Sequence, residues 1–242
     1  MTLQPENWTL PQNVLVVLAH PDDPEFFCGA TLARWADAGH QIDYCLLCCG
    51  NKGWNEATPP DMTPEALCAL RLQEQEAAAR IIGVRSVEFL DHEDGYLVPD
   101  LALRREVVRQ IRAKRPDILV TCDPQNLFAT YGLNHPDHRA AGQAVLDAVF
   151  PAGGNPFYFP DLLEAGLQPH TPREVWISLT NQPDVTLDIT EFWERRLNAV
   201  LQHKSQIPDV PKLVDRLRSR HTNDSTPENP RYEDRFKVVR YG

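Results

Sequence analysis

The sequence predicts an α/β fold, a Rossmann-like, doubly wound and mostly parallel sheet flanked by helices, with a small C-terminal strand and helix extension. Short apolar runs of strand length alternate with segments of helical periodicity, which is typical of repeated β-α-β units. The first run, VLVVLA at 14–19, is continuously apolar, as expected for a parallel strand buried on both faces. We expect residues 1–242 to form a single domain, with a core at about 13–150 and a part at about 151–242 that completes the pocket.

The first half of the chain is expected to supply most of the sheet. Four strands are predicted, at 14–19, 41–49, 87–90 and 117–122. Three helices are predicted to connect them, at 26–38, 63–82 and 101–114. Gly39 and Gly83 are suited to end the first two helices, and Pro116 closes the third. Thr63 and Pro64 fit the N-cap and the first helical position of the second helix.

The second half is predicted to be less regular. A helix is expected at 135–149, before a segment at 151–160 that is broken by glycine and proline. Two late strands at 174–179 and 185–189, a helix at 190–204 and a polar, proline-containing tail are expected to follow. In a doubly wound sheet, ligands bind beyond the carboxyl ends of the strands, so the residues that follow each strand are candidates for a site.

Composition and charge narrow the classes of function. With 24 Lys and Arg against 34 Asp and Glu, the formal net charge of −10 argues against nucleic acid as a partner. No apolar run approaches the length of a membrane span, and the N-terminal residues lack the features of a secretory signal. We therefore expect a cytoplasmic protein that acts on a small molecule, with homo-oligomer formation left open.

The six cysteines are expected to be reduced. Cys45 and Cys48 have CxxC spacing, but they lie within the apolar run YCLLCC, and no second CxxC follows. Side chains alternate between the two faces of a strand, so neighbouring cysteines in this run point apart. Buried core thiols in a cytoplasmic protein are the expected arrangement.

Two polar clusters follow predicted strands. The first, after 14–19, contains His20, Asp22 and Asp23, and the second is Asn-His-Pro-Asp-His at 134–138. Each cluster opens a helix after a strand of the same sheet. Taken alone, either cluster is explained by carboxylates that complement a helix N-terminus, or by a histidine that caps its own helix. Two such clusters at equivalent positions instead indicate a divalent metal site.

The chemistry of the two clusters suggests a catalytic metal centre. Two imidazoles and one carboxylate, from His20, Asp23 and His138, leave a coordination position for water, as in catalytic zinc sites. One zinc ion per chain is expected, with another divalent metal possible. Asp22 is a candidate base for the water, and His135 is a candidate electrostatic stabiliser or acid. Asp137 is expected to orient an imidazole.

The same stretches resemble the LmbE/PIG-L family of zinc-dependent N-deacetylases, which act mainly on N-acetylglucosamine-type groups. The family motif A-H-P-D-D-E is similar to 19–25, where Pro24 precedes the last acidic residue, and its motif H-P-D-H matches 135–138. Three further segments resemble the family, the turn at 50–53, the helix at 71–83 and the segment at 201–206. The resemblance covers most of residues 14–206.

The resemblance implies roles for individual residues. The metal ligands it implies are His20, Asp23 and His138, with Asp22 as general base and His135 as oxyanion stabiliser or proton donor. Arg71 stands in the place of an arginine that binds sugar hydroxyls, with a surface ion pair to a nearby glutamate as the alternative. Asp94 is expected either to touch substrate or to serve as a plain turn residue. Glu25, Asn51 and His203 receive no role.

The expected reaction is therefore hydrolysis of an N-acetyl group on an N-acetylglucosamine-type sugar or sugar conjugate. A metal-dependent amidase or esterase acting on a non-sugar small molecule is the alternative. A nucleotide-binding module is disfavoured because carboxylates stand where the phosphate-binding glycine motif would follow the first strand. The segments at 54–61, 123–134 and 151–172 are expected to wall the pocket.

Overall fold

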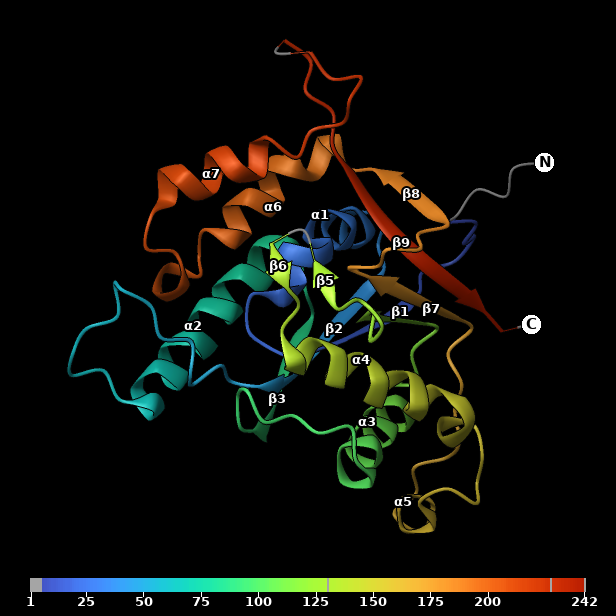
Figure 1. Cartoon of the computed structure of the whole chain (residues 1–242). Helices are drawn as coiled ribbons and strands as arrows, with labels where there is room; N and C mark the ends of the chain where they lie inside the picture. Colours follow the sequence, from blue (N-terminus) through green and yellow to red (C-terminus); the bar gives the residue numbers. More distant parts are fainter. Residues whose placement is uncertain (1–5, 130, 227, 242) are drawn as a thin grey trace.

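A seven-stranded mixed sheet with strand order β3-β2-β1-β4-β7-β9-β8 forms the centre of the molecule (Figure 1). This computed structural model describes residues 6–129, 131–226 and 228–241, so Met1 to Pro5, the start of the segment in which the features of a secretory signal were not found, lie outside the described residues. The strands of the sheet are β1 (Asn13–Leu18), β2 (Gln41–Cys48), β3 (Ser86–His92), β4 (Ile118–Cys122), β7 (Glu174–Ser178), β8 (Val185–Asp188) and β9 (Glu233–Arg240). A separate hairpin consists of β5 (Phe128–Ala129) and β6 (Gly132–Leu133).

Strands β3, β2, β1, β4 and β7, which are neighbours in the sheet in this order, are parallel to one another. This confirms the expected mostly parallel α/β sheet. β1 lies between β2 and β4, with Val14 opposite both Ile42 and Ile118. The chain runs outward from β1 to β2 and β3, and then returns to place β4 on the other side of β1. The point where the strand order reverses therefore lies between β1 and β4, where doubly wound folds bind ligands.

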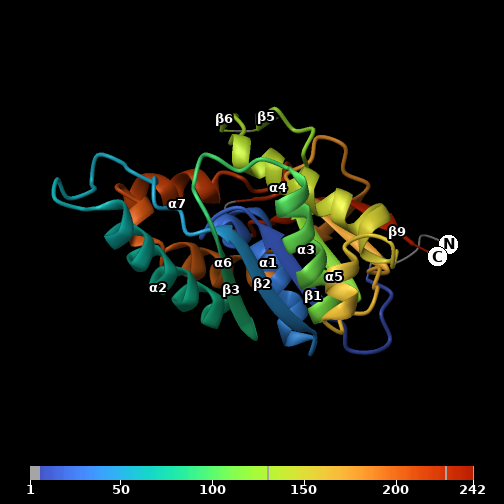
Figure 2. The same ribbon diagram turned by 90° about the horizontal axis from the view of Figure 1, so that it is seen from below.

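Helices cover both faces of this sheet (Figure 2). The main helices are α1 (Asp23–Asp37), α2 (Pro64–Ile82), α3 (Leu101–Lys114), α4 (Pro136–Asp147), α5 (Pro160–Glu164), α6 (Trp193–Val200) and α7 (Val210–Arg218). Shorter helical turns occupy η1 (Ala148–Gly153), η2 (Thr190–Phe192) and η3 (Lys204–Gln206). Helices α1, α2 and α6 pack together on one face, and α3 and α4 pack on the other.

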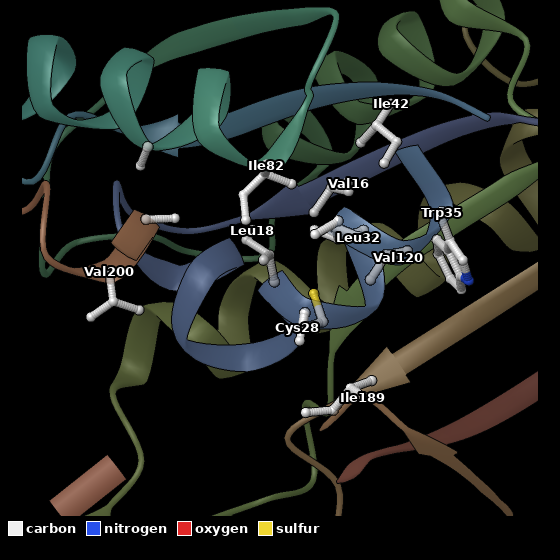
Figure 3. Packing of buried hydrophobic residues seen from close by; sticks show 14 of the residues in the cluster. Val16, Leu18, Cys28, Leu32, Trp35, Ile42, Ile82, Val120, Ile189 and Val200 are labelled. Carbon is white, nitrogen blue, oxygen red and sulfur yellow. The ribbon is translucent and has the colours of Figure 1, made fainter. Parts of the chain in front are cut away.

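The alternation of side chains along β1 divides the core into two layers. Val16 and Leu18 belong to the cluster that contains Cys28 and Leu32 of α1 and Ile82 of α2 (Figure 3). Leu15 and Val17, on the opposite face, pack with α3 and α4. Every residue from Val14 to Leu18 is at most 1% exposed, which explains why this strand is apolar at every position.

The elements from β1 to β4 follow the predictions closely, and Thr63 is the N-cap of α2, where its side chain accepts from the backbone N–H of Ala66. The first helix begins at Asp23 rather than at residue 26, so the acidic cluster forms its first turn. The helix expected at 190–204 is shorter, because α6 ends at Val200. The irregular segment expected at 151–160 begins later than predicted, because the π-helical turn η1 continues to Gly153.

The polar tail contains two elements, α7 and β9, beyond the late strands and helix that were expected. β9 inserts antiparallel between β7 and β8, and it buries Asp234, Phe236 and Val238 on one face. The intervening Arg235 and Lys237 are exposed, and this alternation makes the strand less apolar than the buried parallel strands.

The expectation that all six cysteines are reduced is wrong for two of them. Cys49 and Cys68 form a disulfide, whereas Cys28, Cys45, Cys48 and Cys122 are free and buried. Cys49 lies just beyond the end of β2, where α2 brings Cys68 to a Cα–Cα distance of 5.2 Å. This pairing depends on how α2 packs, which the local CxxC pattern does not reveal. Within the described residues, no helix is long and apolar enough to cross a membrane.

We predict that the C-terminal strand is essential for stability. Phe236 is 0% exposed and packs edge-on against Trp176, with ring centroids 5.2 Å apart. Phe236→Ala should lower the free energy of unfolding by about 3–5 kcal/mol, because it leaves a cavity in the core. Chemical denaturation measures this loss. Lys237→Ala, which removes only the exposed pair with Asp184, should cost less than about 1 kcal/mol. Equal losses in both variants would contradict the assignment.

Candidate metal centre and active site

The two polar clusters meet at the carboxyl ends of β1 and β4. His20 follows β1 by two residues, and His135 is the N-cap of α4 after the loop that follows β4. Because β1 and β4 are adjacent parallel strands, their carboxyl ends lie at the same edge of the sheet. The ring centroid of His20 lies 4.7 Å from that of His135 and 5.3 Å from that of His138.

The three expected metal ligands lie close together. Nδ1 of His20 is 3.3 Å from Nε2 of His138, and this Nε2 is 3.0 Å from Oδ1 of Asp23. Nδ1 of His20 is also 3.5 Å from Oδ2 of Asp23. A tetrahedral zinc ion with bonds of about 2.0–2.2 Å places neighbouring ligand atoms about 3.3–3.6 Å apart. The spacing of these three side chains therefore fits a zinc-sized ion.

The second nitrogen of each imidazole also has partners. Nε2 of His20 lies 3.1 Å from Oδ1 of Asp94 and 3.2 Å from Oδ2 of Asp137. Nδ1 of His138 lies 2.9 Å from Oδ1 of Asn134 and 3.3 Å from the Tyr131 hydroxyl. With a metal ion bound between these side chains, the oxygen acceptors at the outer nitrogens would favour the tautomers whose lone pairs face the ion, as in other histidines that bind metal.

A second group of possible ligands uses the opposite nitrogen of His20, together with Cys48 and Asp137. The Cys48 thiol donates to the carbonyl of Ala19 at 3.1 Å, and burial raises the pKa of this thiol. Asp137 accepts from the backbone N–H of Gly95 at 2.6 Å. A protonated thiol is a poor ligand, so this group suits zinc less well.

A third possible group replaces Asp23 with His135. Nδ1 of His135 accepts from the backbone N–H of Asp137 at 3.2 Å, which leaves its other nitrogen to carry a proton. Burial, His20 and His138 lower the pKa of His135, so the neutral ring with a single N–H is favoured. His135 lines the cavity at this site, where its other nitrogen is available to donate a hydrogen bond.

The charges of the cluster favour a cation. Burial alone would raise the pKa of Asp23, but His138 and His20 hold it far below the usual range. Burial opposes protonation of His20, yet Asp137, Asp23 and Asp94 raise its pKa well above the usual value. The pKa of Asp94 falls to about 2, because its interaction with His20 outweighs burial. Ionised carboxylates therefore surround His20, and a divalent ion would balance them.

Asp22 has a strained backbone next to this cluster. Its φ of 92° lies in the left-handed region, which a residue with a side chain adopts only when its surroundings enforce it. The backbone N–H donates to Oε1 of Gln75 at 2.8 Å. The carboxylate lies 3.3 Å from Nη2 of Arg71 and lines the cavity. Burial raises its pKa, although Arg71 opposes the shift.

Arg71 is buried rather than part of a surface ion pair with a glutamate, so that alternative is wrong. It is 4% exposed and donates to the carbonyls of Gly50 at 2.9 Å and Pro21 at 2.7 Å. A Cβ on Gly50, which has φ of +71°, would lie 2.2 Å from this guanidinium. Only glycine fits there, both in conformation and in space.

Three residues without an expected role have defined contacts. Glu25 and His203 are both 0% exposed, and Nε2 of His203 lies 3.1 Å from Oε2 of Glu25. Glu25 also accepts from Nε2 of Gln75, the residue whose oxygen receives the Asp22 N–H. His203 therefore belongs to a buried chain of hydrogen bonds that ends at Asp22. Oδ1 of Asn51 accepts from the backbone N–H of Asp94 at 3.4 Å.

A cavity of about 730 Å³ contains the cluster. His20, Asp22, Asp23, Arg71, Asp94, His135 and His138 all line it, whereas Asp137 lies behind His20 and is 0% exposed. Asn126 and Tyr131, from the segment at 123–134, also line it, as that prediction expected.

The other two predicted walls are wrong. Residues 54–61 and 151–172, all of which the structure describes, do not line the cavity. Residues at 179–181 and between Trp193 and Arg235 take their place, because β9 returns the end of the chain to this edge. Neither Gln75 nor Tyr131 was singled out from the sequence, because their relation to the site arises only from tertiary contacts.

Comparisons with known proteins agree with this geometry. The profile of the PIG-L family, described as GlcNAc-PI de-N-acetylase, matches residues 15–149. Diacetylchitobiose deacetylase of Thermococcus kodakarensis is 35% identical to this chain, and the match covers 82% of this chain and 71% of the relative's length. Probable N-acetyl-alpha-D-glucosaminyl L-malate deacetylase 2 of Bacillus anthracis is 28% identical over 81% of each chain.

A solved structure supports the fold. The N,N'-diacetylchitobiose deacetylase from Pyrococcus horikoshii, complexed with its inhibitor MPG, superposes with a TM-score of 0.84 at 28% identity. The match covers 94% of this chain and 84% of that one. The matched profile spans both polar clusters and the helix that carries Arg71. The family resemblance is thereby confirmed, and the chain belongs to the PIG-L family.

Proposed function

We propose that the protein is a zinc-dependent hydrolase that removes the acetyl group from an N-acetylglucosamine-type sugar or sugar conjugate. The observation that carries this proposal is the convergence of His20, Asp23 and His138, with Asp22 beside them in one cavity. The deacetylases among the relatives support the reaction type and the class of substrate.

His20, Asp23 and His138 would hold the zinc ion, and Asp137 with Asp94 would orient His20 from behind. When bound, the ion supplies a Lewis acid that polarises an amide carbonyl and acidifies water. Two nitrogens and one carboxylate oxygen leave room for water and substrate, as in catalytic zinc sites. The carboxylates around His20 keep its outer N–H engaged, which fixes the orientation of the ring.

Asp22 would act as the general base and take a proton from the attacking water. Burial raises its pKa toward the working range of a base, while Arg71 and Gln75 hold it in position. The protonated Asp22 would then donate to the departing amine, because an amide nitrogen leaves only when protonated.

His135 would steady the oxyanion of the tetrahedral intermediate. Its pKa is lowered and its Nδ1 already accepts a hydrogen bond, so its remaining N–H is available as a donor. A neutral ring is a weak acid, which is why the proton for the amine is assigned to Asp22. Arg71 and Asp94 line the cavity, and we propose that they contact sugar hydroxyls.

The proposed reaction is tested by acetate release. Purified protein loaded with zinc should release acetate from N,N'-diacetylchitobiose or N-acetylglucosamine conjugates, and chelation should abolish the release. Liberated amine measured in parallel should equal the acetate. Cleavage of simple N-acyl amides or esters with no release from any N-acetylated sugar would instead favour the non-sugar alternative.

The metal assignment is tested by elemental analysis of variants. Wild type should bind about one zinc per chain, and His20→Ala or His138→Ala should lose most of it, because each removes one of three ligands. Two controls separate the rival groups of ligands. Cys48→Ala and His135→Ala should retain the metal. Loss of metal in Cys48→Ala but not in His138→Ala would place the ion on the other side of His20.

The role of Asp22 is tested by Asp22→Asn. This variant should keep its zinc but lose turnover by roughly 10²-fold or more, because the base is gone. In wild type, turnover should rise with pH through the raised pKa of Asp22, since only the ionised carboxylate accepts a proton. In Asp22→Asn, the residual turnover should not show this rise with pH. Zinc loss in Asp22→Asn would show that Asp22 is a ligand, and an unchanged rate would remove it from the mechanism.

A further inference from the structure

A carboxylate and an imidazole that the proposed mechanism does not use are buried together beside the site. Glu25, in the first turn of α1, and His203, just after the end of α6, are both 0% exposed. Nε2 of His203 lies 3.1 Å from Oε2 of Glu25. Burial alone would lower the pKa of His203, but the contact with Glu25 raises it above the usual value. A buried pair of this kind adds little net stability, so its position between α1 and α6 needs another explanation.

The pair fixes the orientation of a buried amide on α2, the helix that packs against both α1 and α6 (Figure 1). Nε2 of Gln75 lies 3.1 Å and 3.2 Å from the two carboxylate oxygens of Glu25. An ionised carboxylate only accepts hydrogen bonds, so the group of Gln75 that faces it has to be the NH2. Oε1 of Gln75 is then directed at the backbone N–H of Asp22, which donates to it at 2.8 Å. Because Gln75 is 0% exposed, solvent does not offer its amide other partners.

The orientation of this amide matters because Asp22 has a left-handed backbone that needs bonds on both sides. The carbonyl of Asp22 accepts from the backbone N–H groups of Glu25 at 3.1 Å and Phe26 at 3.0 Å. On the other side, the Asp22 N–H donates to the Gln75 amide. If this amide turned over, its NH2 would face the Asp22 N–H, and two donors would oppose each other. The φ of 92° would then lack support on one side, and the carboxylate would lose its fixed position.

We propose that Glu25 and His203 are positioning residues for the general base, and that they hold the Asp22 carboxylate in place by fixing the Gln75 amide. This inference rests on the proposed function, because it assumes that Asp22 takes a proton from the attacking water. Neither Glu25 nor His203 lines the cavity, so both act through Asp22 rather than on the substrate. Correct placement has a large effect on rate, since a displacement of about 1 Å can cost roughly 10²-fold.

A neighbouring residue in the same segment provides a matched control. Ser205 lies two residues after His203 and also binds α2. Its hydroxyl donates to Oε2 of Glu74 at 2.7 Å, and its backbone N–H donates to Oε1 of Glu74 at 2.8 Å. These bonds do not belong to the chain that leads to Asp22. Ser205→Ala therefore removes a hydrogen bond between this segment and α2, but it leaves every member of that chain in place.

The proposal is tested by the kinetics of acetate release in zinc-loaded Glu25→Gln and His203→Leu. Glu25→Gln keeps the shape of the side chain but presents a donor as well as an acceptor, so the Gln75 amide can turn over. Both variants should lower kcat by roughly 10-fold or more, with KM and bound zinc unchanged. Ser205→Ala should keep the wild-type kcat. A wild-type kcat in both Glu25→Gln and His203→Leu would overturn the proposal, as would an equal fall in Ser205→Ala or a fall accounted for by loss of zinc.

A double-mutant cycle separates positioning from a general structural role. If the pair acts through the Asp22 carboxylate, adding Glu25→Gln to Asp22→Asn should not lower the residual turnover further, because the base is already absent. A general loss of structure would instead lower turnover by the same factor with and without Asp22→Asn. An equal fall in both backgrounds would therefore overturn the proposal.

Hydrogen exchange of the Asp22 amide, measured by NMR, tests the same positioning without the reaction. This N–H should exchange slowly in wild type and in Ser205→Ala. Glu25→Gln and His203→Leu should each increase its exchange rate several-fold, because the bond to Gln75 is weakened. Unchanged exchange in both variants would overturn the proposal. The expected change in exchange, together with no acetate release by wild type, would support the positioning of Asp22 and count against the proposed deacetylase function.

Discussion

Burial of several carboxylates at one edge of the sheet is the constraint on which the rest of the site depends. Asp23 and Asp137 are at most 3% exposed, yet they lie next to one another across His20. Unpaired charges at such positions would strongly destabilise the fold. Imidazoles shared between the carboxylates reduce this penalty, and a divalent ion between Asp23, His20 and His138 would reduce it further. Because β1 and β4 pair as neighbours, their carboxyl ends bring the buried carboxylates together and also place the imidazoles of His20 and His138 beside them.

The position of Asp22 depends on contacts from distant parts of the chain. Gln75 of α2 accepts a hydrogen bond from the Asp22 N–H and donates to Glu25, which in turn contacts His203, just after the end of α6. Arg71 binds the Pro21 carbonyl and the Asp22 carboxylate. These contacts account for a left-handed backbone at a residue that is not glycine. The strained backbone of Asp22 lowers the stability of the fold, and in return the carboxylate is held in one position at the cavity. A cost in stability of this kind is typical of catalytic sites.

The sequence predicts those features that are encoded locally. Continuous apolar runs identify the buried parallel strands, and the N-cap Thr63 marks the start of α2. The polar residues after β1 and β4 point to the site because parallel neighbouring strands end at the same edge. The partner of Arg71, the pairing of Cys49 with Cys68 and the insertion of β9 could not be predicted in this way. Each depends on the packing of segments far apart in the sequence, for which local patterns carry no signal.

The site divides into two parts with different origins along the chain. The PIG-L profile matches residues 15–149, and these contain all the residues assigned to the metal, the base and the oxyanion. The cavity wall from Trp193 to Arg235 lies outside that match and comes from α6, α7 and β9. A shared reaction requires the first part to keep its geometry, whereas different sugar conjugates require different walls. The residues proposed for the chemistry therefore lie in the parallel core, and the C-terminal elements that close the cavity supply the wall on which the choice of sugar conjugate would depend.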